Sequence, residues 1–207
     1  MYVPDHFQEK DLDAVHQIVS TAPLCALVAQ TPSGLVANHL PVLLDGERLI
    51  GHIARANDLH RVLDDDSPVL AIFQAGDAYI SPNWYPSKAD HHRHVPTWNY
   101  RVAHLHGRIR FFHEESAGRA VVARLTRTHE EATHGDAAWR MSDAPPDFID
   151  GMLKEIVAFE ITVTRVQAKA KLSQNRAPED YRGVVRALDD RGEHGLAADM
   201  RAIDDSE

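Results

Sequence analysis

The chain has 207 residues with 22 Lys and Arg, 31 Asp and Glu and 14 His, so its formal net charge is −9 with histidine neutral. An apolar fraction of 43% and a charged fraction of 26% are typical of a globular protein and exclude wholesale disorder. The acidic balance excludes a generally basic protein that coats nucleic acid, and six of the histidines lie between His91 and His113.

The first predicted element is a short amphipathic helix over residues 11–20, where apolar residues recur at helical spacing. Three strands are predicted next, at 24–30, 35–44 and 48–54, and turn signals at 31–34 and at Asp45-Gly46 connect them. So short a connection makes the last two strands pair antiparallel. Pro41 predicts that its strand lies at an edge or carries a bulge.

The middle of the chain is predicted to contain a short helix at 57–65, a strand at 68–74, a turn at Gly76-Asp77 and a loop at 82–96 that three prolines punctuate. A strand over 102–112 alternates between two kinds of side chain. One face would meet a core and the other water, a partner or a ligand. The core face has Ala103, Leu105, Gly107, Ile109 and Phe111, and the other has His104, His106, Arg108 and Arg110.

The remaining predicted elements are helices at 114–134, 145–153, 178–190 and 193–204, with one strand at 157–164. Adjacent hairpins argue against βαβ winding and favour a small antiparallel barrel or sandwich with inserted and appended helices. The sequence has no dinucleotide fingerprint, phosphate-binding loop or nucleophile elbow.

The single cysteine, Cys25, excludes an internal disulfide framework, and its apolar surroundings favour a buried small hydrophobe. The N-terminus lacks the basic and apolar regions of a signal peptide, and no apolar run approaches the roughly 20 residues of a membrane helix. We therefore expect a soluble, cytoplasmic protein.

Residues 79–100 concentrate aromatic side chains with interleaved polar groups. Tyr and Trp combine a flat apolar body with one hydrogen-bonding group, which suits planar polar ligands. The alternative is a packed turn whose aromatics cap one end of a barrel, and the residue types alone leave both open. The aromatics are Tyr79, Trp84, Tyr85, Trp98 and Tyr100.

Six collinear stretches resemble the PaiB-type family of FMN-binding negative transcriptional regulators: MYVPDHF (1–7), ANHLPVLL (37–44), GHIARAND (51–58), YISPNWYPSK (79–88), VPTWNY (95–100) and KLSQNR (171–176). The resemblance implies a mainly β fold with appended helices, an antiparallel split β-barrel like that of flavin reductases and pyridoxamine-phosphate oxidases. It implies a barrel domain over 1–176 with inserted helices, and a helical extension over 177–207. It also implies FMN in a cleft at a homodimer interface.

Within this resemblance, Arg55 is the expected phosphate ligand, because a phosphate needs charge-assisted donors. Arg55 and Asn57 lie between a strand and a short helix, whose N-terminus would favour an anion. His52 would donate to phosphate or ribityl oxygens. The alternatives are an ion pair between Arg55 and Asp58, and a core histidine at position 52.

The resemblance extends the FMN site to other segments. Of Asn38 and His39, which point to opposite strand faces, at most one faces the ring. Lys88 and Asn99 would contact the N1/O2 edge of the flavin or a second ligand. The complete set of expected FMN ligands is Asn38, His39, His52, Arg55, Asn57, Ser81, Trp84, Tyr85, Lys88, Trp98, Asn99, Tyr100, Lys171, Gln174 and Asn175.

Other functions stay open from the sequence. No acid, base or nucleophile with a placed partner is evident, so a flavin-dependent reductase or oxidase would rely on the flavin itself. A metal or haem site would use His104 and His106 with His91, His92 and His94, but no acid lies between Asp90 and Glu114, and we assign no metal ligands.

Charge is unevenly distributed along the sequence. Residues 178–207 carry nine acids and four arginines and show no basic recognition helix, which disfavours direct DNA binding. Residues 81–113 carry five Lys or Arg against Asp90 alone. We expect this basic segment to suit a small phosphorylated planar cofactor.

Overall fold

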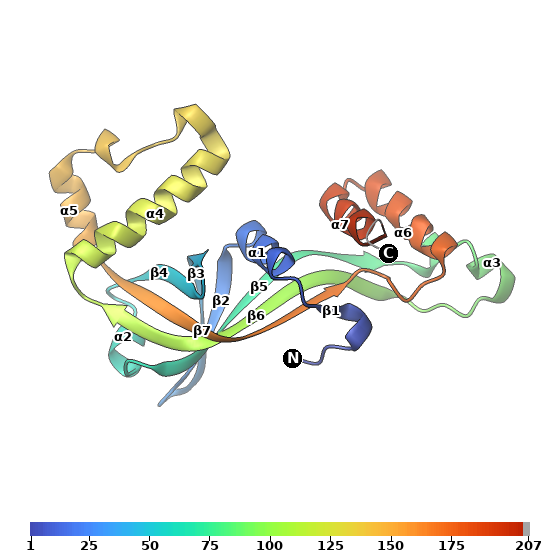
Figure 1. The fold of residues 1–207 in the computed structure, drawn as a ribbon, viewed down its shortest axis with the longest axis horizontal. Coiled ribbons are helices and arrows are strands. Elements are labelled where there is room, and N and C mark those ends of the chain that lie inside the picture. Colours follow the sequence, from blue (N-terminus) through green and yellow to red (C-terminus); the bar gives the residue numbers. More distant parts are fainter. Residues whose placement is uncertain (205–207) are drawn as a thin grey trace. The chain divides into compact units, whose positions relative to one another are not determined.

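The computed structural model describes residues 1–204, which divide into two compact units (Figure 1). The first unit contains residues 1–21, 74–103 and the chain from 167 onward, and the second contains 22–73 and 104–166. Helices α6 and α7 of the predicted C-terminal extension belong to the first unit. Residues 205–207, the end of that extension, lie outside the described residues.

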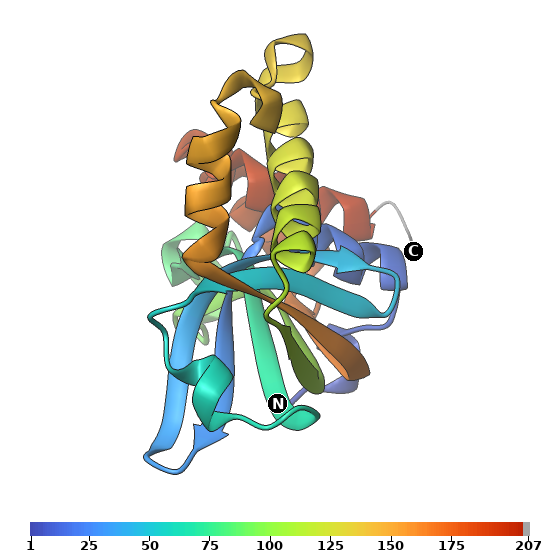
Figure 2. The same cartoon turned by 90° about the vertical axis from the view of Figure 1, so that its left-hand side faces the viewer.

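Seven strands form one antiparallel sheet in the order β1-β7-β4-β3-β2-β5-β6, and an additional pairing of β7 with β6 closes it. The predicted antiparallel split barrel is thereby confirmed. Figure 2 shows the strands of the second unit curving around a common interior. The strands are β1 (Gln8–Glu9), β2 (Leu24–Thr31), β3 (Gly34–Asp45), β4 (Arg48–Ala54), β5 (Ser67–Ile80), β6 (Thr97–Phe112) and β7 (Ile156–Lys171).

In the strands of the second unit, every second side chain points into the interior of the barrel. In β2 these are Cys25, Leu27 and Ala29, all fully or almost fully buried. Burial raises the pKa of the Cys25 thiol to about 12, which agrees with its expected role as a small hydrophobe. The predicted alternation of β6 is confirmed, since every residue of its expected core face is buried.

The barrel closes where β6 meets β7. At Gly107 a Cβ atom would lie 2.4 Å from Ile161 Cγ2 and 2.6 Å from the Thr162 carbonyl oxygen. Thr164 Oγ1 donates to the His106 carbonyl at 3.2 Å beside this contact. Only a residue without a side chain lets the two backbones approach so closely.

Pro41 does not mark an edge, so that part of its prediction is wrong. β3 lies between β4 and β2, and its pairing with β2 ends at Leu24↔Pro41. The pairing with β4 begins one residue later, at Val42↔Gly51. Pro41 thus lies where the pairing of β3 changes from β2 to β4. Proline has no N–H to donate, and at this position its absence costs the sheet the fewest hydrogen bonds.

The predicted turn at Gly76-Asp77 is also wrong, because β5 continues through it to Ile80. Gly76 has a φ of 64°, and the two exposed residues Gly76 and Asp77 stand between buried Ala75 and Ala78. An extra residue that shifts the alternation is what a β-bulge produces. Strands β6 and β7 likewise extend beyond their predicted ends, at the N-terminus of β6 and the C-terminus of β7.

The long helices lie where the sequence predicted them. In the second unit, α4 packs against β4 and against α5, and Figure 2 shows the two helices side by side. The expected loop at 82–96 contains a 3₁₀ turn, η2 (Pro82–Trp84), and one turn of helix, α3. The helices are α1 (Leu12–Thr21), α2 (Leu59–Val62), α3 (Lys88–His91), α4 (Glu115–His134), α5 (Pro146–Lys154), α6 (Pro178–Asp190) and α7 (His194–Asp204), with further 3₁₀ turns η1 (Asp5–Phe7), η3 (Gly135–Ala137) and η4 (Met141–Asp143).

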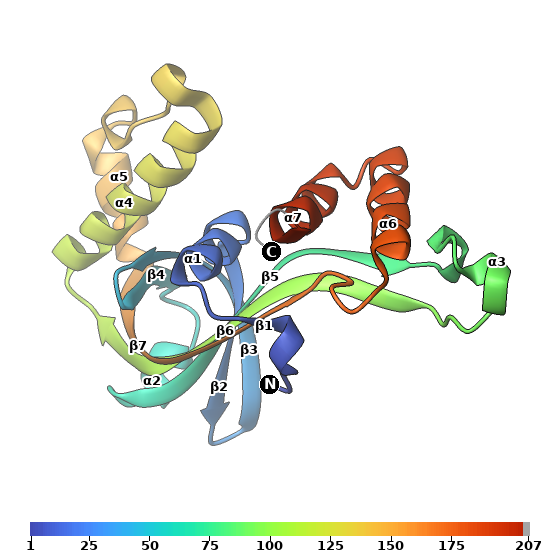
Figure 3. The same cartoon turned by 45° about the vertical axis from the view of Figure 1, so that its right-hand side comes forward.

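In the first unit, α6 and α7 lie along the outer parts of β5 and β6 (Figure 3). They bury a cluster that joins Ile80 of β5, Leu172 after β7 and Val184 of α6 with Met200 of α7. A Cβ at Gly183 would lie 2.2 Å from the Trp84 carbonyl oxygen, so α6 packs directly on the backbone of the aromatic segment. Within residues 1–204, no helix is long and apolar enough to cross a membrane.

Candidate functional site

The fifteen expected FMN ligands fall into two groups, one in each compact unit. The second unit holds five of them on β3, β4 and the turn that follows β4: Asn38, His39, His52, Arg55 and Asn57. The first unit holds the other ten, on the aromatic segment, on β6 and around the end of β7.

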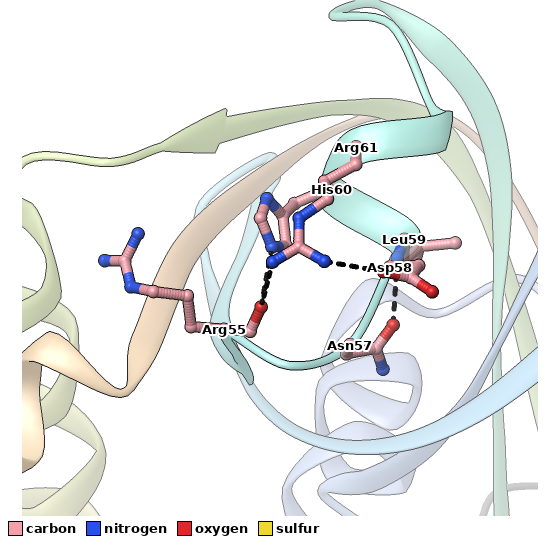
Figure 4. Close-up of polar contacts among 6 residues, drawn as sticks. All are labelled: Arg55, Asn57, Asp58, Leu59, His60 and Arg61. Atoms are coloured by element: carbon pink, nitrogen blue, oxygen red, sulfur yellow. Dashed lines mark hydrogen bonds and ion pairs between the residues drawn. The ribbon is translucent and has the colours of Figure 1, made fainter.

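Arg55 opens the turn after β4 and is half-buried. Its guanidinium donates to the Lys154 and Ile156 carbonyls at 2.5 and 2.8 Å, and Figure 4 shows the side chain extending away from the turn. The alternative ion pair with Asp58 does not form, because Arg61 pairs with Asp58 at 2.7 Å. Two neutral carbonyls therefore fix the direction of the Arg55 guanidinium.

Two side chains of the same turn hold the Arg55 backbone in place. The Arg55 carbonyl accepts hydrogen bonds from His60 Nε2 at 3.0 Å and from Arg61 at 3.2 Å (Figure 4). Since a carbonyl can only accept, the proton of neutral His60 is on Nε2. The position of Arg55 is thus set by hydrogen bonds at both its side chain and its backbone.

Asn57 connects the turn to β3. Its Oδ1 accepts from the Leu59 N–H at 3.0 Å, and its Nδ2 donates to Asn38 Oδ1 at 2.8 Å. The amide oxygen thereby satisfies one of the first N–H groups of the single-turn helix α2, whose N-cap residue Asp58 makes no side-chain capping hydrogen bond. The structure brings Asn38 and Asn57 together as a polar pair at the barrel surface.

His52 projects from β4 and is half-buried, and its Nδ1 atom is buried without a hydrogen-bond partner among the described residues. Burial lowers the pKa of its imidazole. The alternative of a core histidine with its hydrogen bonds satisfied does not describe this ring. An unpaired buried nitrogen is the kind of atom that a bound polar group or a water molecule would satisfy.

Asn38 and His39 point to opposite faces of β3, as alternation predicts. Asn38 is half-buried, and His39 is exposed on the outer face beside Ala37. Exposed Leu24 of β2 and Leu35 of β3 share that outer face. The second unit therefore carries an exposed apolar surface on the outer face of this sheet, whereas Asn38 of the polar pair projects from the opposite face of β3.

Three of the first unit's expected ligands, Ser81, Trp84 and Trp98, line one cavity of roughly 470 Å³. Tyr79 meets Trp98 edge to face with ring centroids 6.0 Å apart, and the Arg191 guanidinium lies 5.7 Å from the Trp84 ring. Tyr79 and Trp98 are each about half exposed. A wall of exposed aromatic rings is suited to stacking against a planar ligand.

A second polar network surrounds the end of β7. Lys171 Nζ donates to Thr97 Oγ1 and, at 2.8 Å, to the Trp98 carbonyl. Asn99 is fully buried and accepts from Ser173 Oγ at 3.1 Å. Gln174 folds back on the chain, accepting from the Leu172 N–H and donating to the Ala170 carbonyl. In this state Asn99 and Gln174 brace the backbone around Lys171.

The other expected ligands of the first unit are spread over its surface and core. Lys88 donates to Asn83, and Asn175 is exposed. Tyr100 is half-buried, with the Lys169 ammonium 5.3 Å from its ring centroid. Tyr85 is buried with its ring against Arg176, whose guanidinium lies 4.9 Å from the ring centroid. The structure therefore places Tyr85 beside Arg176, which is not among the expected FMN ligands.

Sequence reasoning missed the buried group Ser87, His94 and Asp180. Ser87 Oγ donates to Asp180 Oδ2 at 2.7 Å, and the Ser87 N–H donates to Oδ1 at 3.1 Å. Because the single hydroxyl proton of Ser87 goes to the carboxylate, His94 Nε2 must donate to Ser87 Oγ, 2.8 Å away. Asp180 lies 93 residues from Ser87, and no local pattern links the two.

The histidines of the basic segment do not assemble with acids or with one another into a metal site. Within residues 1–204 no three His, Cys, Asp or Glu side chains gather where they could hold a metal ion. His106 instead lies against the Arg165 guanidinium, 2.9 Å from its Nε2. The expected alternative of a metal or haem site at these histidines gains no observation from the structure.

Comparisons with known proteins agree with this fold. Residues 1–165 match the family model described as "Putative FMN-binding domain". The protease synthase and sporulation protein PAI 2 of Bacillus subtilis (strain 168) is 30% identical over 192 residues, which cover 91% of this chain and 89% of that protein. An uncharacterized protein of Emericella nidulans is 26% identical and covers 93% of this chain and 92% of that protein.

Solved structures share the architecture at low sequence identity. The flavocytochrome Anf3 from Azotobacter vinelandii gives a TM-score of 0.63 at 14% identity, covering 87% of this chain and 78% of that one. The FAD and heme binding protein from Mycobacterium smegmatis gives 0.58 at 17% identity, covering 84% and 78%. At such identities these likenesses show the fold alone.

The environment of His52 predicts a pH dependence of stability. Its pKa is lowered in the folded state, so on acidification the unfolded chain binds the proton first. Its stabilising contribution is therefore present above the unfolded pKa of about 6.5 and is lost as the pH falls toward the folded value. Urea unfolding of the wild type and of His52→Gln, between pH of about 7.5 and about 5.5, measures the difference.

The variant should lose less stability than the wild type over that range. His16→Gln, at an exposed histidine of α1, is the matched control and should follow the wild type. Parallel curves for the wild type and His52→Gln would contradict the assignment.

Proposed function

Because the chain belongs to the family of FMN-binding domains, which it matches over residues 1–165, we propose that it is a homodimeric flavoprotein whose FMN sites each take residues from both subunits. FMN is its cofactor. The observation that carries the placement of FMN is the donor set on and after β4. It consists of Arg55, which pairs with no carboxylate within residues 1–204, and the buried Nδ1 of His52, which has no hydrogen-bond partner there.

The residues present fit an FMN phosphate and its ribityl chain. Arg55 supplies a fixed positive charge, and His52 supplies a nitrogen whose hydrogen bond is unmade. The Asn38–Asn57 pair offers amide groups beside them on the same turn and on β3. When bound, FMN would supply redox chemistry, and these residues would hold and orient it.

The proposed dimer interface is the outer face of the β3–β2–β5 sheet. Ala26 and Val28 of β2 pair with Ile72 and Leu70 of β5 on this face. Leu24 and Leu35 are 60% and 74% exposed at its borders. A contiguous apolar sheet surface is typical of a subunit interface. We propose a second copy as its occupant, because the family resemblance implies a cofactor shared between two chains.

The regulatory role of the chain is proposed by similarity to PAI 2, whose name refers to protease synthesis and sporulation. We propose that this role does not use direct, tight DNA binding. Among the described residues, α6 and α7 carry more acids than arginines; Arg201 of α7 pairs with Asp189, and Arg191, between the two helices, stacks on Trp84. Acidic helices repel phosphate, whereas specific binding needs basic contacts.

The placement of the FMN phosphate predicts the effect of Arg55→Gln. Purified wild-type protein should be yellow and contain FMN, and the variant should bind added FMN at least about tenfold more weakly, since one charge-assisted contact is lost. Fluorescence titration of FMN into protein stripped of flavin measures both affinities.

The control is Arg124→Gln, which removes an exposed cation of α4 paired with Asp45 in the same unit. It should bind FMN like the wild type. A colourless wild-type preparation that ignores added FMN would refute the cofactor's binding to this chain, and unchanged affinity in folded Arg55→Gln would refute its role.

The proposed interface predicts that Leu35→Asp converts the dimer into a monomer, because a carboxylate would have to be desolvated on association. The sedimentation coefficient and the FMN content should fall together if the cofactor lies between subunits. Leu12→Asp, at an equally exposed leucine of α1, should stay dimeric. A monomeric wild type at tens of micromolar, or a variant that remains dimeric, would contradict the interface.

Direct DNA binding is tested by gel shifts at physiological salt with DNA from upstream of the protein's own gene and a scrambled control. We expect neither a tight nor a sequence-selective complex from dimer with or without FMN. A nanomolar, salt-resistant complex with one sequence alone would overturn this expectation.

A further inference from the structure

Three cations gather at the end of β7 in the first unit, and we call Lys169, Lys171 and Arg176 the cationic cluster. No ion pair within residues 1–204 joins any of them to a carboxylate. Burial, followed by the charges of Lys169 and Arg176, lowers the pKa of Lys171. Lys169 and Lys171 lie two residues apart in β7, so strand alternation places both on one face, and Arg176 lies in the turn that follows, where its N–H donates to the Ser173 carbonyl at 3.0 Å.

Lys169 is only 7% exposed, and its surroundings are aromatic. Its ammonium lies 5.8, 5.9 and 5.3 Å from the ring centroids of Tyr2, Phe7 and Tyr100. Aromatic faces stabilise a cation without neutralising it. The ammonium of Lys169 is thus held by aromatic faces and by no carboxylate of the described residues.

Lys171 and Arg176 also contact neutral groups. Lys171 donates to Thr97 Oγ1 and to the Trp98 carbonyl, and Arg176 lies on the face of Tyr85. Long cationic side chains are usually exposed or paired, yet both of these are half-buried. Their directions are fixed by contacts that leave the positive charge uncompensated.

One buried polar atom beside the cluster, the Tyr85 hydroxyl, has no hydrogen-bond partner among the described residues, and it belongs to the ring that Arg176 covers. The buried carboxylate of Asp180 already accepts from the side chain and backbone of Ser87 and lies 3.7 Å from His94 Nε2. Unpaired buried polar atoms cost stability unless a bound molecule satisfies them.

From these contacts we propose that the cationic cluster binds the anionic group, a carboxylate or a phosphate, of a small molecule other than FMN. The Tyr85 hydroxyl would add a neutral donor at its margin. The three cations belong to the first unit, whereas Arg55, the phosphate ligand proposed above, belongs to the second. In this assignment Lys171 serves the second ligand and not FMN.

The experiment titrates inorganic phosphate, and separately acetate, into the full-length protein by calorimetry, with chloride holding the ionic strength constant. It is carried out on protein without FMN and on protein saturated with FMN. Lys171→Met and Arg176→Met each remove one charge of the cluster. Arg186→Met removes an exposed cation of α6 as the matched control.

Phosphate or acetate should bind the wild type and Arg186→Met in both flavin states, and each cluster variant should weaken that binding at least about tenfold. Cooperative unfolding of Lys171→Met and Arg176→Met verifies that these variants are folded. If only one of them folds, that variant is compared with the wild type and Arg186→Met. Equal binding by all four proteins, or no binding of either anion, would overturn the proposal.

Titrations of the protein with and without FMN distinguish this site from the proposed FMN site. Anion binding that disappears when FMN is added would make the cluster the seat of the FMN phosphate and overturn the assignment to a second molecule. If FMN itself does not bind, the comparison of variants in the flavin-free protein still decides whether the cluster is an anion site.

Discussion

The contact between β6 and β7 at Gly107 is the constraint on which the second unit depends. The sheet can close only where two strands approach with no side chain between them, and a Cβ here would overlap both Ile161 and the Thr162 carbonyl. Closure places Leu105 and Ile109 of β6 in the same interior as Ile161 of β7. It also fixes β4 against β7, so that the turn after β4 can anchor Arg55 on the carbonyls of Lys154 and Ile156.

The strands that close the barrel are longer than the barrel needs, and their extra length builds the first unit. β5 runs on through the bulge at Gly76, β6 begins at Thr97, and β7 ends at Lys171. The aromatic segment therefore starts and ends on strands, and the cationic cluster follows directly from one. Asp180 of α6 then holds the segment by accepting twice from Ser87, a side chain in the middle of it.

Local patterns were sufficient for most elements and insufficient for the sites. β4, α6 and the alternation of β6 follow from periodicity and turn residues that lie within a few positions of one another. The turn prediction at Gly76-Asp77 failed because a bulge and a turn share glycine with a positive φ, and only the pairing of neighbouring strands tells them apart. The partners of Ser87 and Arg55 lie about a hundred residues away, where no window of sequence can find them.

Local sequence patterns also fail to predict which charged side chains form ion pairs. The basic segment 81–113 is compensated in part in three dimensions, since Arg101 pairs with Asp199 and Arg110 with Asp65. The family resemblance identified Lys171 and Arg55 as candidate ligands, but it could not show that neither pairs with a carboxylate of residues 1–204. Nothing in the composition distinguishes a paired arginine from a free one, because pairing is decided by the fold.

A net charge of −9 does not prevent such a chain from binding small anions. At physiological ionic strength the Debye length is about 8 Å, so acids farther away are largely screened and the groups within a few ångströms decide the binding. At the cationic cluster those groups are three cations, aromatic rings and neutral acceptors, while Asp180 is occupied by Ser87 and His94. The lowered pKa of Lys171 shows that burial and like charges disfavour its protonated form. A bound anion would reduce the repulsion between these cations. Without an anion the repulsion lowers the stability of the folded state, and anion binding would raise it.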